Sequence, residues 1–576
     1  MRFVGPKNMS RKNHTDLFRN EYPDKAVFIA VVLYIGVFAA IILRFSLIRA
    51  FNFDEFQVLY ASASLIRGKA LYADHIGTHF PFVNILFSFL IKVLGFHTST
   101  VLAARLFTSL FFYLTLFFTF KITELLWDKL SGVLAVALVM STIVFVDKGI
   151  EIRHDVFNMA FNTIGAYWGL KYLKENKRHF AWLSGLFLGL ALASTQKAVV
   201  WNIGISVGLF LSVIRLKRSK KLPEAIALFG GGFVIPLAFS VGYLILVCGE
   251  NLKAFLDITV INAVGYLSPQ KANAVYSFPY TKSSILKALF YENGFFYLLS
   301  LIGLLASLVA WFRRGVIEGV IGFWALIGIL FYLHISRPFL QSLLPTMPAL
   351  GILAVGLIMK FRVRLQQNSM KKNLLVGLMA LVLMLGWPSY IIAFKLQQNR
   401  AMTKQMENIS FCLASLKPDD KVLCFSQQQI FFDPVLRFPE DECGGSIYEF
   451  DAKCFERKMI RQKCKVVIND RRTRGLSKTI QEKLKNHFLL ANVGNILVPG
   501  FLVAPKSIVE KEIWVPGPYY SPTREMTIDG KSIEDNVIDL EQKTYAFENP
   551  TPRSAVLLYV FARESFIEKL EKKSIR

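Results

Sequence analysis

The feature that most constrains this chain is a series of long apolar segments separated by short runs of basic residues. A transmembrane helix needs about 20 mostly apolar residues to cross the roughly 30 Å hydrocarbon core of a bilayer. The clearest candidates are 26–48, 99–120, 225–248, 295–312, 316–335, 339–360 and 373–395. Shorter candidates with the same pattern are 132–147, 156–172, 181–196 and 198–214. The sequence therefore predicts an α-helical polytopic membrane protein with about eleven spans.

Composition excludes the main alternatives to a membrane protein. Of 576 residues, 53% are apolar and 19% are charged, whereas soluble domains average about 25% charged residues. These values exclude a disordered chain and a small secreted scaffold. The 67 basic and 41 acidic residues give a net charge of +26. Because the basic residues lie in runs between apolar segments, the positive-inside rule explains them, and no nucleic acid partner is expected.

The basic runs also predict the orientation. We interpret the segment 81–96, which is short and contains Lys92, as a helix lying in the membrane interface. The strong basic clusters then all fall in the cytoplasm, as the rule requires: 171–178, 215–221 and 360–372. Residues 1–25 are expected to be cytoplasmic and the C-terminal tail extracytoplasmic. The first span, 26–48, is followed by no small-residue cleavage site and is expected to remain as an anchor.

Beyond the predicted membrane domain, 26–400, residues 401–576 read as a soluble domain without long apolar runs. The first unit, 405–495, shows an α/β pattern, with a helix at 477–489 capped by Ser477 and strands at 421–424 and 465–468. The second unit, 496–562, is predicted to be rich in β-structure. Its expected strands are 496–498, 513–515, 526–528 and 556–561, with a turn at Asp529 and Gly530.

Five of the six cysteines lie in this tail: Cys412, Cys424, Cys443, Cys454 and Cys464. Export to an oxidising compartment favours one or two disulfides. Buried free thiols are an equally open interpretation, and the pairing does not follow from the sequence. The tail has no Cys-x-x-Cys pair, so no zinc site is predicted.

The predicted orientation collects polar side chains on the outer side of the membrane. The first outer loop, 49–98, begins with Asp54 and Glu55, an acidic pair suited to deprotonating a hydroxyl or to holding a cation. An ordinary acidic helix start is the alternative. The second loop, 151–155, contains two acids, an arginine and a histidine, namely Glu151, Arg153, His154 and Asp155. A solvated hairpin is the alternative for this loop.

Basic groups near the ends of the spans are candidate ligands of a phosphate: Arg105, Lys197 and Arg337. Such groups can also extend to lipid phosphates without any function, an alternative that applies best to Arg105. The remaining candidate site residues on this side are Tyr72, His75, His79 and His334. Charged groups near a membrane span are costly, so their collection on one side indicates a single site that opens outward.

The order of these elements resembles that of the GT-C glycosyltransferases over roughly residues 26–395. The resemblance is to the branch that uses dolichyl- or undecaprenyl-phosphate sugars, which includes protein O-mannosyltransferases, lipid A aminoarabinose transferases and lipopolysaccharide-core galacturonosyl transferases. The first-loop acid of that family matches Asp54, the second-loop acid matches Asp155, and the lysine after the fifth span matches Lys197. Arg337 matches the arginine before the Pro-x-x-Pro helix, which here contains Pro345 and Pro348.

Two features depart from the family pattern. The first loop has one proline, Pro81, where most members have two, and Ser194, Thr195 and Gln196 replace a run of small residues before Lys197. Both departures bear on which sugar donor the protein prefers and not on its fold.

The resemblance implies a glycosyltransferase (hexosyl or pentosyl) of the bacterial inner membrane, with a polyprenyl-phosphate sugar as donor. The acceptor would be a glycolipid such as lipid A or core oligosaccharide, another glycan, or a protein. Asp54, with Glu55 beside it, would be the general base, and Arg105, Lys197 and Arg337 would hold the leaving phosphate. Asp155 would orient the acceptor or the base, or bind a divalent ion. No cofactor or metal is predicted.

Two other functions remain open. A transporter or flippase of lipid-linked sugars is expected to show inverted repeats or broken spans with polar groups at the middle of the membrane. A polysaccharide polymerase or ligase would share the donor and need a larger outer loop, for which the segment 249–294 offers a candidate.

Overall fold

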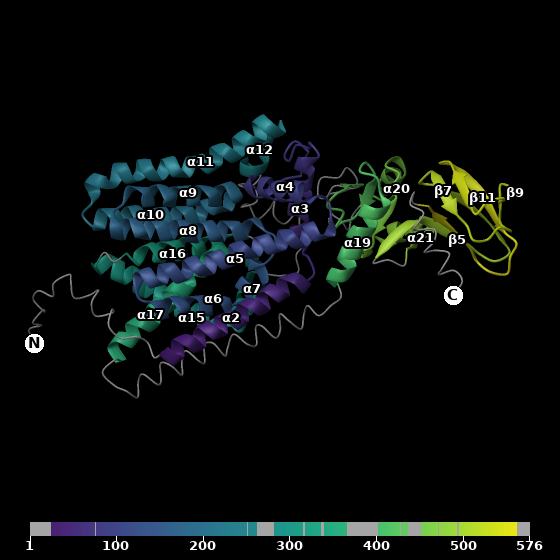
Figure 1. The fold of residues 1–576 in the computed structure, drawn as a ribbon. Helices are drawn as coiled ribbons and strands as arrows, with labels where there is room; N and C mark the ends of the chain where they lie inside the picture. Colours follow the sequence, from purple (N-terminus) through teal and green to yellow (C-terminus); the bar gives the residue numbers. More distant parts are fainter. Residues whose placement is uncertain are drawn as a thin grey trace, which may run out of the picture.

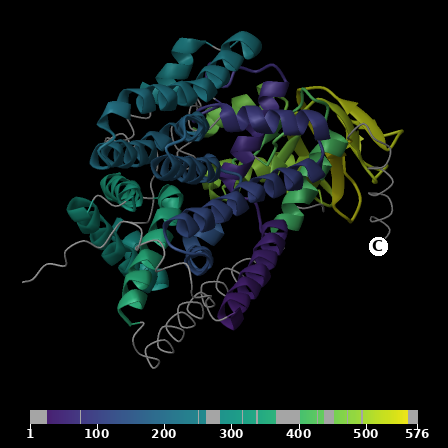
Figure 2. The same cartoon turned by 60° about the vertical axis from the view of Figure 1, so that its left-hand side comes forward.

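The structure is a computed structural model. It describes residues 25–74, 76–249, 251–261, 282–314, 317–335, 339–365, 401–426, 428–435, 451–470, 472–491 and 495–560. An elongated bundle of helices forms the larger part, and a smaller unit of strands and short helices is attached to one end of it (Figure 1). Figure 2, turned so that the bundle comes forward, shows this smaller unit behind it. The predicted combination of a helical membrane domain and a sheet-containing C-terminal domain is confirmed.

The bundle comprises the helices α2 (Lys25–Ile48), α3 (Phe53–Ile66), α4 (Phe82–Leu94), α5 (Thr98–Leu126), α6 (Lys129–Met140), α7 (Ile143–Gly149), α8 (His154–Glu175), α9 (Arg178–Ser194), α10 (Val199–Arg215), α11 (Leu222–Cys248), α12 (Leu252–Leu256), α15 (Lys282–Arg314), α16 (Gly319–His334) and α17 (Met347–Leu365). Short helical turns join some of them: η1 (Gln196–Ala198), η2 (Ser219–Lys221), η3 (Asp257–Ile261) and η4 (Leu340–Thr346).

Six helical segments among the described residues are long and apolar enough to cross a membrane, or up to seven if the bent pair α6 and α7 forms one span. The expected spans 156–172 and 181–196 are the helices α8 and α9, and α4 and α16 are shorter apolar helices. The expected span 373–395 lies outside the described residues. The multi-pass character is therefore established, and the expected number of about eleven spans stays a prediction.

The expected continuous span 132–147 is wrong in detail. The helices α6 and α7 meet there at a bend of 75°, and the side chain of Asn293 satisfies the backbone at the break. Its Oδ1 accepts a hydrogen bond from the Ile143 amide (3.1 Å), and its Nδ2 donates to the Ser141 carbonyl (3.3 Å). Asn293 is itself the non-helical residue at the kink of α15. Broken helices are tolerated at membrane depth where neighbouring helices supply the missing hydrogen bonds.

The turn between α8 and α9 and the turn between α10 and α11 lie at the end of the bundle away from the C-terminal domain (Figure 1). These turns contain basic residues of the clusters 171–178 and 215–221. Arg218 donates to the Leu173 carbonyl (2.9 Å), which links the turn after α10 to the end of α8. Lys360 of α17 lies 3.6 Å from Glu318 at the start of α16. Basic residues in these turns are the basis of the predicted orientation, and the orientation itself stays a prediction.

The C-terminal domain begins with α19 (Ala401–Ser415) and contains α20 (Ala452–Arg461), α21 (Lys478–His487) and the short turn η5 (Thr473–Gly475). Its strands are β1 (Lys421–Leu423), β2 (Asp433–Pro434), β3 (Val466–Ile468), β4 (Phe488–Leu490), β5 (Ile496–Val503), β6 (Ser507–Glu512), β7 (Gly517–Tyr520), β8 (Thr527–Ile528), β9 (Lys531–Ser532), β10 (Val537–Leu540), β11 (Thr544–Asn549) and β12 (Ala555–Tyr559). One sheet has the order β10-β7-β12-β5-β3-β1-β2, with β4 also paired to β5, and β6-β11-β8-β9 forms a second sheet.

The strand β5 joins the two parts of this domain because it pairs with β3 on one side and β12 on the other. The helix capped by Ser477 is confirmed, since the Ser477 hydroxyl accepts from the Ile480 amide (3.4 Å). The expected strand at 513–515 is wrong: these residues form a bend between β6 and β7, where Trp514 and its neighbours are buried. Their apolar character reflects burial in a loop rather than a strand.

The cysteines of the tail divide into two kinds. Cys454 is disulfide-bonded, whereas Cys412, Cys424 and Cys464 are buried free thiols. Cys443 lies outside the described residues. Both interpretations of the sequence therefore apply, to different cysteines.

Candidate active site

The two acids of the first loop lie side by side in the first turn of α3 and point to different surroundings. Glu55 is completely buried, whereas the Asp54 side chain is 40% exposed. The Asn52 amide, just before the helix, donates to Glu55 Oε2 (2.8 Å). Successive residues of a helix are separated by about 100° around its axis, so only one of the two faces the open side.

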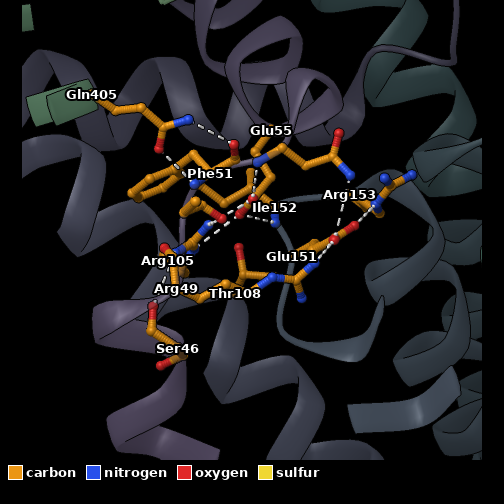
Figure 3. Close-up of polar contacts among 12 residues, drawn as sticks. Ser46, Arg49, Phe51, Glu55, Arg105, Thr108, Glu151, Ile152, Arg153 and Gln405 are labelled. Carbon is orange, nitrogen blue, oxygen red and sulfur yellow. Dashed lines mark hydrogen bonds and ion pairs between the residues drawn. The ribbon is translucent and has the colours of Figure 1, made fainter. Parts of the chain in front are cut away.

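Glu55 is held by three segments of the chain (Figure 3). Arg105 of α5 donates from Nε to Oε1 (2.9 Å) and from Nη2 to Oε2 (2.6 Å), and the Ile152 amide of the second loop donates to Oε1 (3.1 Å). Arg105 also donates to the carbonyl of Ser46 (3.1 Å), and its guanidinium lies 3.5 Å from the centre of the Phe51 ring. These contacts occupy both charged groups and favour a structural role for Glu55 and Arg105.

Glu151 is the centre of a second buried network, which adjoins the first. Its carboxylate accepts from Arg49 and from Nε of Arg153, and Lys148 Nζ lies 3.1 Å from Oε1. Burial alone would raise the pKa of Glu151, but the charges of Arg153 and Arg49 outweigh it and hold the pKa well below its usual value. The sequence marks Glu151 as part of the charged 151–155 motif, but no catalytic or binding role was predicted for it.

Arg153 connects this buried network to the exposed acid. Its Nη1 lies 2.6 Å from Asp54 Oδ2, while its Nε is bonded to Glu151. Asp155 follows in the first turn of α8, and its Oδ1 lies 4.0 Å from Nζ of Lys197 in the turn η1. The structure thus brings together Asp54, Arg153, Asp155 and Lys197, which come from three separate segments of the sequence.

Two histidines complete the same region. The rings of His79 and His154 lie 4.5 Å apart between centroids. His154 Nε2 is 2.9 Å from Asn84 Oδ1, and His79 Nδ1 is 3.3 Å from Gln196 Oε1. The hydroxyl of Tyr72 donates to the His79 carbonyl (2.6 Å), so Tyr72 supports the loop. Burial, followed by the charge of Lys197, lowers the pKa of His79 to about 4, so the ring is neutral at physiological pH.

The amide side chains of Asn84 and Gln196 were missed by sequence reasoning. Neither side chain carries a charge, and each is placed beside a histidine only by the packing of α4 and α9.

The structure leaves two of the predicted residues undescribed and places a third at the end of α16. His75 and Arg337 lie outside the described residues. His334 is exposed at the end of α16, at the same end of the bundle as Lys197, because Trp201 near the start of α10 contacts Phe331 with ring centroids 5.6 Å apart. Among the described residues, no group of three His, Cys, Asp or Glu side chains is arranged to hold a metal ion.

Comparisons with known proteins bear on the fold. The family profile of dolichyl-phosphate-mannose-protein mannosyltransferases matches residues 78–243, which include His79, Arg153, Asp155 and Lys197. No protein with a curated function matches the sequence.

Similar solved structures come from ArnT of Cupriavidus metallidurans. The form bound to undecaprenyl phosphate has a TM-score of 0.57 and 14% identity, covering 81% of this chain and 97% of that one. The apo form has a TM-score of 0.53 and 15% identity, covering 82% and 98%. An oligosaccharyltransferase of Archaeoglobus fulgidus, tethered to an acceptor peptide, has a TM-score of 0.48 and 13% identity, covering 76% and 68%. At these identities the likeness to ArnT shows the fold, and it confirms the predicted GT-C architecture.

Proposed function

We propose that this chain, with its GT-C fold, is an integral-membrane glycosyltransferase that moves a sugar from a polyprenyl-phosphate donor to an acceptor hydroxyl. The observation that carries the proposal is the cluster at one end of the bundle. In it the exposed carboxylate of Asp54 forms an ion pair with Arg153, close to the pair formed by Asp155 and Lys197. The matched family profile and the undecaprenyl phosphate in one ArnT structure support a lipid-phosphate donor.

In this mechanism Asp54 accepts the proton of the acceptor hydroxyl as its oxygen attacks the anomeric carbon. A carbon–oxygen bond to the acceptor forms, the bond between the anomeric carbon and the donor phosphate breaks, and the polyprenyl phosphate leaves as the anion. A single displacement of this kind inverts the anomeric centre. Arg153 is bonded to Asp54 and holds its carboxylate toward the open side of the site.

Lys197 is the described cation best placed to hold the departing phosphate, because its side chain is 31% exposed and lies beside Asp155. Arg337 retains the same role in the proposal through the family resemblance alone. Asp155 would orient Lys197 or the acceptor. Arg105 contributes indirectly, since its guanidinium is committed to Glu55. The proposed reaction uses no metal or cofactor.

The proposed location is the bacterial inner membrane, with the N-terminus in the cytoplasm and the C-terminal domain outside. The turns after α8 and α10 lie at the bundle end opposite that domain, and their basic residues support this orientation through the positive-inside rule. The acceptor would then be an extracytoplasmic glycolipid, glycan or protein.

The test uses a deletion strain complemented with the wild-type chain, Asp54→Asn or Asp74→Asn. Asp74 is a matched control because it belongs to the same loop and is bonded to the Ala70 amide (3.2 Å). Mass spectrometry of envelope glycolipids and glycoproteins should show one sugar lost in the deletion strain. We expect that the wild-type chain and Asp74→Asn restore it and that Asp54→Asn, expressed at the same level, does not. Restoration by Asp54→Asn would exclude Asp54 as the base, and an unchanged glycan inventory after deletion would contradict the transfer itself.

A further inference from the structure

The C-terminal domain contacts the segment that carries Asp54 at the residue next to it. The ring of Phe53 lies 3.9 Å from the guanidinium of Arg472. Arg472 follows β3, and its Nη1 donates to the carbonyl of Phe425 after β1 (3.2 Å). Its own amide donates to Asp470 Oδ1 (2.8 Å). Arg472 therefore lies in a turn that is bonded to the segments after β1 and β3, and its guanidinium contacts the first residue of α3.

A second contact lies two residues earlier in the chain (Figure 3). The side-chain amide of Gln405 in α19 pairs with both backbone groups of Phe51. Its Oε1 accepts from the Phe51 amide (2.8 Å), and its Nε2 donates to the Phe51 carbonyl (3.0 Å). The Gln405 side chain thus bonds to Phe51 as a residue of a neighbouring strand would. It holds the backbone of the segment that leads into α3.

The third contact lies at the other end of α3. Arg67, which follows the last residue of the helix, donates to the Phe431 carbonyl (3.1 Å) and lies 3.4 Å from Asp433 Oδ1. Lys69 also bonds to Asp433, and Lys421 within the domain bonds to its second oxygen (2.7 Å). Burial alone would raise the pKa of Asp433, but the hydrogen bonds from Lys421 and Lys69 outweigh it and lower the pKa to about 2.

We infer that the C-terminal domain is a clamp that grips both ends of α3 and thereby sets the position of Asp54 against Arg153. Gln405, Arg472 and Asp433, named here the clamp residues, are positioning residues for the reaction. The inference rests on the proposed function, which makes Asp54 the reacting acid. It assigns to the domain a part in catalysis that needs no contact with donor or acceptor.

A positioning role differs from mere support of the helix. Ten of the fourteen residues of α3 are buried, and the helix packs against α4 of the bundle, so we expect it to stay folded in variants of the clamp residues. In the first turn, Arg105 holds the buried Glu55, while the exposed Asp54 contacts Arg153. The clamp residues Gln405 and Arg472 contact Phe51 and Phe53, which lie next to this turn or begin it. A displacement of about 1 Å at a reacting group can reduce a rate by about 100-fold, and the clamp prevents such a displacement.

The experiment uses the full-length chain with Gln405→Ala, Arg472→Met or Asp433→Asn, and Arg472→Lys as the conservative variant. Asp420→Asn is the matched control, since it breaks an ion pair of the same domain, Asp420 to Lys465 (2.8 Å), that does not reach α3. Two measurements are made: steady-state transfer with the natural membrane lipid extract as donor source, and hydrogen exchange of the backbone amides at the start of α3.

We expect kcat to fall by about tenfold or more in the clamp variants, with KM for the donor unchanged. Exchange at the start of α3 should become faster while the thermal midpoint stays within about 2 °C of the wild type. Arg472→Lys should recover part of the rate, because a lysine can also lie over the Phe53 ring. Asp420→Asn should behave as the wild type in both measurements.

Unchanged exchange in all the clamp variants would overturn the inference, and so would an equal loss in Asp420→Asn, which would indicate a general weakening of the domain. The exchange measurement does not require transfer activity. Faster exchange in variants of a chain whose wild type transfers no sugar would retain the clamp and contradict the proposed function instead.

Discussion

The carboxylate of Glu55 and the guanidinium of Arg105 form a two-point ion pair, Nε to Oε1 at 2.9 Å and Nη2 to Oε2 at 2.6 Å, with both side chains almost completely shielded from solvent. The pair joins α3 to α5, and the amide of Ile152 adds the second loop to the same carboxylate. A buried pair of this kind is not needed for stability in itself, but it fixes the relative position of the segments that it joins. Here those segments carry Asp54 and Arg153.

The first prediction concerns this pair. Arg105→Met leaves the Glu55 carboxylate buried without its partner, so we expect a loss of about 3–5 kcal/mol in the free energy of unfolding. The double variant Arg105→Met with Glu55→Leu removes both charges and should recover much of this loss. Unfolding of the purified protein in detergent would measure both effects. If Arg105→Met instead kept full stability and raised KM for the donor, the guanidinium would be a phosphate ligand after all.

The second prediction concerns Lys197. Because its side chain is partly exposed and its Nζ lies 4.0 Å from Asp155 Oδ1, Lys197→Met should change the stability by less than about 1 kcal/mol. Transfer should nevertheless fall by about 100-fold or more, because a cation that stabilises a departing phosphate acts in the transition state. Transfer rates in membranes measure the effect, with Lys253→Met, an exposed lysine of α12, as the control. Equal rates in the two variants would remove Lys197 from the mechanism.

The third prediction is a dependence on pH. Burial and Lys197 lower the pKa of His79 to about 4, whereas an unfolded histidine titrates near 6.5. Between about pH 6.5 and pH 4 the unfolded chain therefore binds a proton that the folded chain does not, and the contribution of His79 to stability is lost as the pH falls through this window. Above pH 6.5 the contribution is fully present.

The variant His79→Gln should consequently show a smaller fall in thermal midpoint from pH 7 to pH 4 than the wild type. His97→Gln, which changes an exposed histidine before α5, is the control and should follow the wild-type curve. A variant His79→Gln that follows the wild-type curve as well would show that His79 is freely protonated in the fold.

Much of the membrane domain follows from hydropathy and charge, because lengths of apolar sequence and the placement of basic runs are dictated by the bilayer itself. The same argument brings Asp54, Asp155 and Lys197 to one side before any contact is known. The argument does not show which of the two acids, Asp54 or Glu55, faces the open site. Both are acidic neighbours in the sequence, and only the packing of the fold buries Glu55. The partner of Glu55 is 50 positions away along the chain.

The contacts between the C-terminal domain and the segment around α3 are even harder to predict from the sequence. Gln405 and Phe51 are 354 positions apart, and an isolated glutamine before a tail carries no pattern that points to a backbone partner. The bend between α6 and α7 was missed for a related reason, because the stabilising Asn293 lies 150 positions later. Local propensity describes the elements, whereas these features depend on which elements meet.

The last prediction concerns the close packing of α9 against α11. A Cβ atom on Gly185 would lie 1.9 Å from the backbone oxygen of Phe229, and one on Gly189 would lie 2.2 Å from that of Phe233. Both oxygens belong to helix backbone, which cannot move aside as a side chain can. Small residues four positions apart allow helices to approach closely in a membrane, where packing rather than the hydrophobic effect drives association.

We therefore expect Gly185→Ala and Gly189→Ala each to destabilise the fold by about 1–3 kcal/mol, the usual cost of overpacking, and to separate the helices. Gly231→Ala is the matched control, because it lies in α11 with no atom within 4 Å of the added methyl group, and alanine favours a helix over glycine by about 1 kcal/mol. Resistance to unfolding in detergent, measured for the three variants, should fall for the first two and stay level or rise for the third. Because α9 leads directly into the turn that holds Lys197, the two destabilised variants should also lose transfer activity. Equal stability of all three variants would contradict the close packing, because it would mean that α9 and α11 leave room for the added methyl groups.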